Sequence, residues 1–152
     1  MKNPIKRFLF IVKLTVVSPL LLAFWLTTER GNILIDTRRW VKIFKWQENS
    51  DLIQLLRLLQ EAPEYRNLYY YRLFKGNFQG RILMYFLKVI YRQCPYFFLD
   101  TSSNIGAGLF IQHGFSTIIM ADIGTNCWIN QQVTIGHKDE SGRPKIGNNV
   151  RI

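Results

Sequence analysis

Hydrophobic residues follow a helical spacing through much of the first 95 residues. Between residues 33 and 92 they recur three to four positions apart, as at Leu52, Leu55 and Leu59. Stripes with this spacing predict amphipathic helices that bury one face. A run rich in tyrosine, residues 65–73, belongs to the same region, and we expect it to pack between helices with its hydroxyl groups at the rim of the core.

Proline and glycine divide this helical region. Pro63 marks a break between two helices, and Gly76 and Gly80 precede a last helix predicted over residues 81–92. Pro95 then ends the helical part, because proline cannot continue the hydrogen-bonded ladder of a helix.

Residues 8–26 form the most apolar segment of the chain. They follow three basic residues and are nearly all apolar, although Lys13 and Pro19 interrupt them. This arrangement resembles a signal sequence or membrane anchor, although no small-residue cleavage site follows. Two hypotheses stay open: a helix associated with a membrane, and a buried or interfacial helix of the folded protein.

Beyond Pro95 the hydrophobic spacing changes to six. A repeat of six residues fits neither an amphipathic helix nor long alternating strands, and predicts short strands that turn a corner every six residues and wind into a prism. Gly108, Gly114, Asn126 and Asn149 recur three positions after the aliphatic residue and tolerate positive φ at such corners. The predicted inward positions are Leu99, Ile105, Ile111, Thr117, Ile123, Ile129 and Ile135, and after an insertion Ile146 and Ile152.

Net charge is distributed unevenly between the two parts. Residues 1–95 hold 16 Lys and Arg against 6 Asp and Glu, whereas residues 96–152 hold 4 against 4, so the whole excess of +10 lies in the first part. The charges of the first part are scattered over apolar helices and do not form a phosphate-binding surface, which argues against a nucleic-acid partner. An anionic membrane surface or an acidic partner fits better.

Cysteine usage indicates the compartment. Cys94 and Cys127 follow no CxxC spacing and are too few for a disulfide framework. We therefore expect a cytoplasmic protein, with membrane association through residues 8–26 as an addition.

The two histidines are the first candidates for chemistry. His113 follows the inward Ile111 by two positions in its hexapeptide, and we expect its side chain to lie outside the prism. His137 opens the five-residue insertion, and insertions on solenoids often line binding faces. A solvated loop histidine is the alternative for His137.

Four segments carry a resemblance to a known family. They are residues 63–73, 105–114, 123–136 and 144–150, with His113 inside the second. Together they resemble the serine acetyltransferase family of hexapeptide-repeat acyltransferases, including its relatives that acetylate polysaccharides. The resemblance implies an α+β fold, in which an N-terminal helical module precedes a single-stranded left-handed parallel β-helix.

The predicted organisation has three parts. Residues 1–30 form the hydrophobic segment, residues 31–95 the helical module, and residues 96–152 the β-helical acyltransferase domain. Residues 99–152 supply fewer than three coils, and the β-helix is predicted to be truncated at the C-terminus.

The resemblance also implies a reaction and an assembly. Members of the family move the acetyl group of acetyl-CoA to a hydroxyl group, with a histidine at the position of His113 as general base. It implies no metal, a homotrimer or a dimer of trimers, and a small-molecule acceptor. L-serine is the first candidate acceptor, as in cysteine biosynthesis, and a sugar of a capsular or extracellular polysaccharide is the second.

Two departures from the family pattern bear on the acceptor. Gln112 stands where an acidic partner of the base is common, and Arg143 stands where a second histidine is common, which leaves His137 as its substitute. We assign His113 and His137 to catalysis, and Gln112 and Arg143 to substrate binding, since a guanidinium group can hold a carboxylate with two hydrogen bonds.

Three residues are candidates for the coenzyme site, and two other functions compete with acetyl transfer. Thr134, Gly136 and Lys145 are the candidates for contact with acetyl-CoA. A noncatalytic β-helical assembly or membrane-docking protein is the alternative from another class. A metal-dependent hydratase would need three histidine ligands, which two histidines do not supply.

Overall fold

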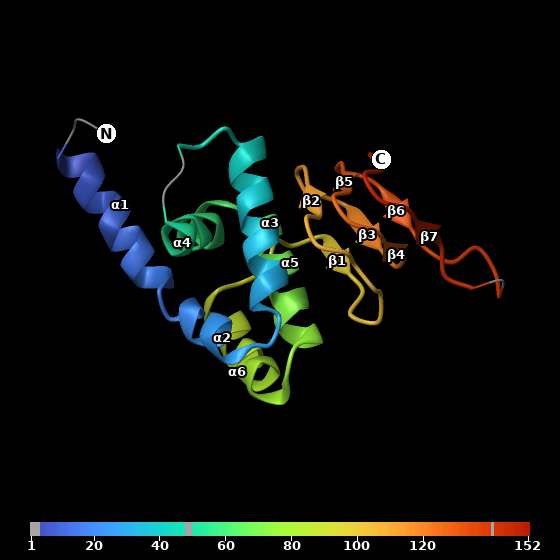
Figure 1. The fold of residues 1–152 in the computed structure, drawn as a ribbon, viewed down its shortest axis with the longest axis horizontal. Helices are drawn as coiled ribbons and strands as arrows, with labels where there is room; N and C mark the ends of the chain where they lie inside the picture. Colours follow the sequence, from blue (N-terminus) through green and yellow to red (C-terminus); the bar gives the residue numbers. More distant parts are fainter. Residues whose placement is uncertain (1–3, 48–49, 141) are drawn as a thin grey trace.

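Six helices precede seven short strands in the part of the chain that the structure describes. The computed structural model describes residues 4–47, 50–140 and 142–152. Figure 1 shows the helices gathered around α3 and α5, with the strands beside them toward the C-terminus. The helices are α1 (Pro4–Val17), α2 (Leu20–Leu26), α3 (Arg30–Ile43), α4 (Asp51–Glu61), α5 (Pro63–Lys75) and α6 (Phe78–Ile90). The strands are β1 (Phe97–Leu99), β2 (Phe110–Ile111), β3 (Thr117–Ile119), β4 (Asp122–Ile123), β5 (Trp128–Ile129), β6 (Thr134–Ile135) and β7 (Lys145–Ile146).

The predicted helix breaks are confirmed, with one shift. Pro63 is the first residue of α5, where its missing N–H costs nothing. The last helix, α6, begins at Phe78 and not at residue 81, because the Asn77 side chain accepts a hydrogen bond from the Gly80 N–H and caps it. Gly80 lies inside this helix, and a Cβ atom there would stand 3.2 Å from the Thr27 Cβ atom.

The tyrosines of α5 pack between helices as predicted, but their hydroxyl groups are not at the rim. Tyr65, Tyr69, Tyr70 and Tyr71 are all buried. The Tyr69 hydroxyl donates to the Leu20 carbonyl oxygen at 2.7 Å, and the other three also meet hydrogen-bond partners inside the fold. Burial raises the pKa of each of these hydroxyls, which therefore stay protonated donors.

The apolar segment of residues 8–26 is divided between two helices. α1 and α2 are separated at Ser18 and Pro19 and meet at an angle of 51°. No single helix within the described ranges is long and apolar enough to cross a membrane, whereas α1 and α2 taken together pass that test by length and composition.

The strands form a coil with three sides. Successive strands join three parallel ladders in rotation, and the ladders are β1-β3-β6, β2-β5 and β4-β7. Ile111 pairs with Ile129, and Ile105 with Ile123, which are both 18 residues apart, so three hexapeptides make one turn. The five-residue insertion lengthens the next turn without breaking the ladder, since Ile123 pairs with Ile146.

One predicted inward position differs in register. Thr117 is fully buried, as predicted, but Leu99 pairs with Ile119, and Ile119 with Ile135, so Ile119 and not Thr117 continues the column of inward aliphatic residues. Eight residues separate Ile111 from Ile119, against six between Ile129 and Ile135 one turn later. The corner after β2 therefore contains two extra residues, and the following corner two fewer, which restores the spacing of six and hides the shift from the sequence pattern.

A buried ion pair joins the helices to the first turn of the coil. The Arg72 guanidinium donates to the Asp36 carboxylate, with Nε 2.8 Å from Oδ2, and both side chains are almost fully buried. The same guanidinium donates to the carbonyl oxygens of Ile105 at 2.6 Å and Gly106 at 2.8 Å. The Gly108 N–H donates to Asp36 from the other side.

The apolar core continues through this junction. Trp40 of α3 is buried, packs against Phe110 of β2 with ring centroids 4.6 Å apart, and donates from Nε1 to the Leu109 carbonyl oxygen at 2.8 Å. One cluster of buried residues extends from α1 to β5 across the predicted boundaries at residues 30 and 95. The helices consequently fix the position of the corner after β2, where His113 lies.

Candidate functional site

The corner that follows β2 holds His113 in an unusual backbone conformation. His113 lies just beyond Ile111 at the lengthened corner, its side chain is exposed as predicted, and its φ is 55°. Positive φ is uncommon outside glycine, although histidine adopts it more readily than most residues. The Phe115 N–H donates to the His113 carbonyl oxygen, which closes the turn. The two extra residues thus place an imidazole outside the coil.

A hollow of about 230 Å³ lies beside this imidazole. Its lining is mostly aromatic and aliphatic, and His113, Gln112 and Glu64 are its polar side chains apart from tryptophan. The lining comes from α3, the start of α5, β2 and β5, and consists of Trp40, Ile43, Phe44, Glu64, Phe110, Ile111, Gln112, His113 and Trp128. An apolar hollow with a few polar groups is the usual form of a small-molecule site.

Two hydrogen bonds fix the polar groups around His113. Gln112 lines the hollow, and its Oε1 accepts from Trp128 Nε1 at 3.1 Å, which holds it to the next turn; its role in substrate binding stays a prediction. Glu64 Oε1 accepts from the Gly114 N–H at 3.3 Å. The carboxylate of α5 is thereby fastened to the corner that carries His113.

His137 and Arg143 lie at another corner of the coil. His137 follows β6 and is exposed, and it does not line the hollow of His113. The Arg143 guanidinium donates to Asp100 at 3.0 Å and lies 3.6 Å from Asp122. Within one chain the structure does not bring either residue to His113, and the Arg143 side chain is engaged by two carboxylates.

The pKa of Asp100 is lowered by its contacts with Ser102 and Arg143. Burial alone would raise the pKa of Asp100, but hydrogen bonds from Ser102 and the charge of Arg143 hold it below its ordinary value. Asp100 is therefore charged near neutral pH, and its ion pair with Arg143 fixes the end of the loop that begins at His137.

The residues predicted to contact acetyl-CoA are exposed or half-buried on two sides of the coil. Thr134 points outward from β6 beside Ile118, and Lys145 is exposed on β7 beside Asp122. Gly136 is half-buried, and a Cβ atom there would meet nothing within 4 Å. Their proposed role stays a prediction.

Neither a protein-family model nor a curated protein matches the chain by sequence. By structure it is similar to serine acetyltransferase isoform 3 from Entamoeba histolytica in complex with cysteine, with a TM-score of 0.56 and 22% identity over 82% of this chain and 45% of that one. It is also similar to serine acetyltransferase 1 from the same organism in complex with L-cysteine, with a TM-score of 0.55 and 19% identity over 82% of this chain and 50% of that one.

The chain has the fold of a serine acetyltransferase. The resemblance inferred from the repeats is confirmed at the level of the fold. The chain spans about half the length of the serine acetyltransferases that it matches.

Sequence reasoning missed part of the site on this serine acetyltransferase fold. Glu64 precedes His113 by 49 positions, and no spacing rule connects a residue of a helical segment with a corner of the coil. Trp128 and Phe110 alternate with inward isoleucines, a signal that sequence analysis left unused. Their rings lie 4.5 Å apart, centroid to centroid, at the edge of the hollow.

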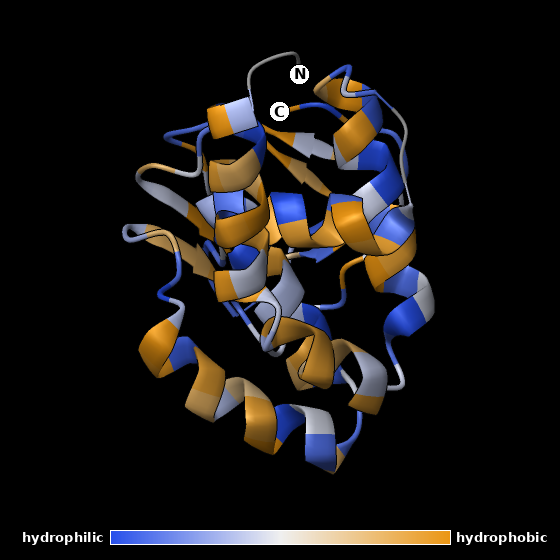
Figure 2. Cartoon of the chain, turned by 90° about the vertical axis from the view of Figure 1, so that its left-hand side faces the viewer, coloured by the Kyte–Doolittle hydropathy of each residue, from blue (hydrophilic) through white to orange (hydrophobic). Residues whose placement is uncertain are grey.

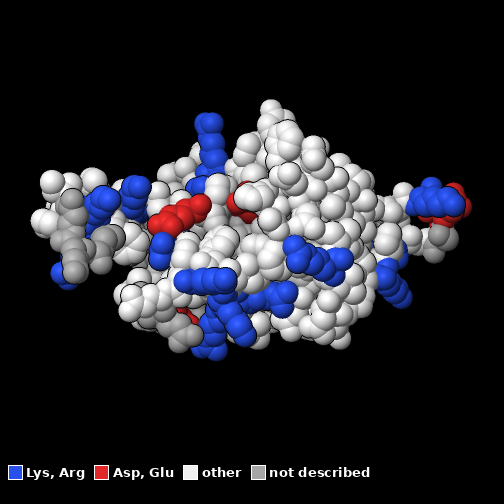
Figure 3. Space-filling model, turned by 90° about the horizontal axis from the view of Figure 1, so that it is seen from above, with Lys and Arg blue, Asp and Glu red and all other residues white. Residues whose placement is uncertain are grey.

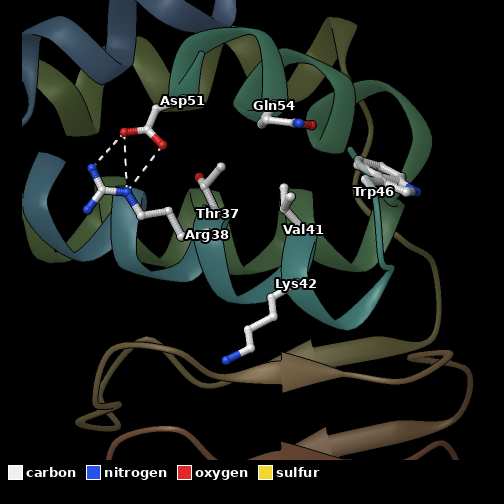
Figure 4. A pocket seen from close by; sticks show the side chains of 7 residues that line it. All are labelled: Thr37, Arg38, Val41, Lys42, Trp46, Asp51 and Gln54. Atoms are coloured by element: carbon white, nitrogen blue, oxygen red, sulfur yellow. Dashed lines mark hydrogen bonds and ion pairs between the residues drawn. The ribbon is translucent and has the colours of Figure 1, made fainter. Parts of the chain in front are cut away.

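A second hollow, of about 320 Å³, lies between α3 and α4 (Figure 4). Its lining includes an ion pair in which Arg38 donates to Asp51 at 2.7 Å, and this hydrogen bond lowers the pKa of Asp51. The lining contains neither histidine nor cysteine, so it offers less for acyl transfer than the hollow of His113.

A metal site requires several donor side chains close together. Among the described residues no group of three or more His, Cys, Asp and Glu side chains is placed to hold a metal ion.

Proposed function

We propose that the chain is an O-acetyltransferase that moves the acetyl group of acetyl-CoA to a hydroxyl group, with His113 as general base. The observation that carries the proposal is the exposed imidazole at the lengthened corner, beside an apolar hollow on a serine acetyltransferase fold. The coil is proposed to be a left-handed β-helix of hexapeptide repeats, and the active assembly a homotrimer or a dimer of trimers. Both belong to the family that the sequence resembles.

The chemistry requires a base because an alcohol is a poor nucleophile at neutral pH. The His113 imidazole removes the hydroxyl proton while the oxygen forms a bond to the acetyl carbon. The carbon–sulfur bond then breaks, coenzyme A leaves as its thiolate, and the proton passes from the imidazolium to that sulfur. The reaction needs neither a covalent enzyme intermediate nor a redox step.

Glu64 is proposed to position the base. The family commonly has a carboxylate just before the histidine, where this chain has Gln112, and Glu64 supplies a carboxylate to the same hollow from α5. A negative charge beside an imidazole stabilises the imidazolium that forms during proton transfer. We expect Glu64→Gln to lower kcat more than it raises the KM of the acceptor.

L-serine is the first candidate acceptor. The structures of similar fold are serine acetyltransferases, and a cation for a carboxylate lies near the hollow, because the Arg151 guanidinium stacks 4.4 Å from the centre of the Trp128 ring. Arg151→Gln is expected to raise the KM for serine and to leave the KM for acetyl-CoA unchanged. Arg143, predicted for this role, is held by Asp100 and Asp122.

A sugar hydroxyl is the second candidate, and the lining of the hollow favours it. None of the nine lining residues is Lys or Arg, and four of them are aromatic. Aromatic rings pack against the apolar face of a pyranose, while amide and carboxylate oxygens such as those of Gln112 and Glu64 accept from its hydroxyl groups.

The test is acetyl transfer by the purified chain. Free thiol release from acetyl-CoA is followed with L-serine and with a panel of free and nucleotide-linked sugars. The base variant is His113→Asn, because asparagine tolerates the φ of 55° and avoids backbone strain. A loss of about 100-fold or more in kcat/KM is expected, the usual contribution of a general base.

The exposed Lys138, which has no assigned role in the site, provides the control. Lys138→Gln is expected to keep kcat/KM within about tenfold of the wild type, because Lys138 lies on the loop after β6 and does not line the hollow. If His113→Asn retains activity within tenfold of the wild type, His113 is not the base. If the wild-type chain transfers acetyl to no acceptor, the noncatalytic assembly is the better account.

A further inference from the structure

The helical part presents hydrophobic residues to solvent on the helices around its N-terminal end. Helix α6 buries one stripe, formed by Gly80, Met84 and Leu87, and exposes a second apolar stripe on the opposite face. This second stripe recurs at helical spacing and consists of Phe78, Ile82, Tyr85, Phe86, Val89 and Ile90. Val89 is 77% exposed, although a surface helix normally has polar residues on that face.

Helices α1 and α2 continue this exposed surface. α2 exposes Leu22, Trp25 and Leu26 while its other face is buried. α1 likewise exposes Phe8, Val12 and Val16 among other apolar residues. In Figure 2, which looks at the side of the molecule that carries α1, hydrophobic residues recur along these helices.

Hydrogen bonds place α2 antiparallel to α6. The Asn77 side chain, before α6, donates to the Leu26 carbonyl oxygen at the end of α2, at 2.9 Å. The Tyr91 hydroxyl, after α6, donates to the Val16 carbonyl oxygen at the end of α1, at 2.8 Å. The three helices are therefore adjacent, and we name their exposed apolar residues together the outer apolar face.

The charged side chains of α1, α2 and α6 themselves are all positive. Lys6, Arg7 and Lys13 are exposed on α1, and Arg92 is exposed after α6. The sequence has no Asp or Glu between residues 1 and 28 or between residues 65 and 99. Figure 3 shows several Lys and Arg side chains at the end of the molecule that carries α1, with acidic side chains beside them toward the middle.

We propose that the outer apolar face of α1, α2 and α6 binds the surface of an anionic lipid bilayer. A bilayer surface combines what this face requires: acyl chains for the apolar side chains and negative headgroups for the basic ones. A second copy of the chain fits less well, because two such faces would bring only positive charges together. The proposal concerns a surface of the helices and does not depend on the acetyl transfer.

The packing of α2 indicates that the helices lie in the interface and do not cross the bilayer. Leu20 and Ala23 are fully buried against the protein, and the Leu20 carbonyl oxygen accepts from the Tyr69 hydroxyl inside the core. A transmembrane path through α1 and α2 would remove these contacts. An in-plane position keeps them and covers only the exposed side of each helix.

The experiment is co-sedimentation of the purified full chain with vesicles. Vesicles of phosphatidylcholine alone are compared with vesicles of phosphatidylcholine and phosphatidylglycerol in equal parts. We expect binding to the anionic vesicles, at least tenfold weaker binding to the neutral ones, and weakening with added salt. Trp25 reports insertion, since brominated acyl chains are expected to quench fluorescence that Trp25→Phe removes.

Two variants test the two components separately. The triple charge variant Lys6→Gln, Arg7→Gln, Lys13→Gln is expected to weaken binding about 100-fold, at roughly fivefold for each basic residue near the surface. Phe86→Ser with Val89→Ser is expected to weaken binding at least tenfold, because both side chains enter the acyl region. All substituted residues are exposed, so the fold, checked by circular dichroism, is unaffected.

Matched controls lie on the coil. Phe115→Ser removes another exposed aromatic residue, and Lys138→Gln an exposed charge, and neither is expected to change vesicle binding. Equal binding to neutral and anionic vesicles, or binding that the charge variant retains, would overturn the proposal. So would failure to bind vesicles together with a dimer that Phe86→Ser, Val89→Ser dissociates, which would assign the face to a second copy.

Discussion

The buried ion pair between Arg72 and Asp36 makes the junction of helices and coil open to a quantitative test. Arg72→Met keeps the length and apolar character of the stem but removes every donor of the guanidinium group. The carboxylate of Asp36 then keeps only the Gly108 N–H, and the carbonyl oxygens of Ile105 and Gly106 lose their side-chain donor.

The size of the effect follows from the charge that remains. Removing one partner of a buried ion pair typically costs about 3–5 kcal/mol. The carboxyl group can escape that cost by taking up a proton, which at pH 7 costs about 4 kcal/mol, since its ordinary pKa is 3.8 and each pH unit is worth about 1.4 kcal/mol. The unpaired carbonyl oxygens add about 1 kcal/mol. We therefore expect Arg72→Met to lower the free energy of unfolding by about 4–5 kcal/mol at pH 7.

The sign of the pH dependence follows from the same group. Burial raises the pKa of Asp36 in the folded protein, and Arg72 opposes this rise. Without Arg72 the pKa rises further, so the variant loses stability as the pH increases above 3.8 and recovers it as the pH falls toward that value. Between pH 7 and pH 5 the loss caused by the substitution should shrink by up to about 3 kcal/mol.

The assay is urea denaturation of wild type and variant at pH 5 and pH 7, at one protein concentration, followed by circular dichroism. Arg66→Met on the same helix is the control, because Arg66 is half-buried and its Nε has no hydrogen-bond partner, and a change under about 1 kcal/mol is expected. Asp36→Asn combined with Arg72→Met should be more stable at pH 7 than Arg72→Met alone, because no unpaired charge stays buried. A loss below about 1 kcal/mol for Arg72→Met, or one equal at both pH values, would refute the reasoning.

Further substitutions test the stacking of the coil and its attachment to the helices. Gly106→Ala would place a Cβ atom 2.6 Å from backbone atoms of the next turn and is expected to destabilise the chain by about 1–3 kcal/mol. Gly136→Ala is the control and should change the melting temperature little, because a Cβ atom there meets nothing within 4 Å. Equal shifts of the melting temperature for both variants would contradict the stacking of the turns. Trp40→Phe removes the donor to the Leu109 carbonyl oxygen and should cost about 1–3 kcal/mol in urea denaturation, and an unchanged midpoint would show that this hydrogen bond contributes nothing.

The sequence predicted the architecture because both of its periods are strong. Spacing of three to four marked the helices, and spacing of six marked the coil and its inward isoleucines, for example Ile111 and Ile129. The register at Thr117 was predicted incorrectly for a physical reason. Two residues added at one corner and two removed at the next cancel over a full turn, so a fixed step of six reaches Thr117, which is buried, and not Ile119, which pairs with Leu99 and Ile135.

The residues of the site were harder to predict from the sequence than the fold was. The exposed position of His113 was predicted, but its cause is the lengthened corner, where the positive φ of His113 turns away a side chain that strand alternation would place on the same face as Ile111. Glu64 enters through the packing of α5 against the corner after β2, which depends on tertiary contacts and not on any local pattern. The same holds for Arg143, where only the structure reveals that Asp100 and Asp122 already occupy its guanidinium group.

The bonds between Arg72 and the backbone of Ile105 and Gly106 have a consequence for how the coil is built. In a solenoid each turn contacts only its neighbours, so a slip of one residue in an early turn would be copied into all later ones and would turn their inward side chains outward. A guanidinium group that donates to two consecutive carbonyl oxygens favours one register of the first turn relative to the helices. The helices thus help to set the register that the following turns of the coil share.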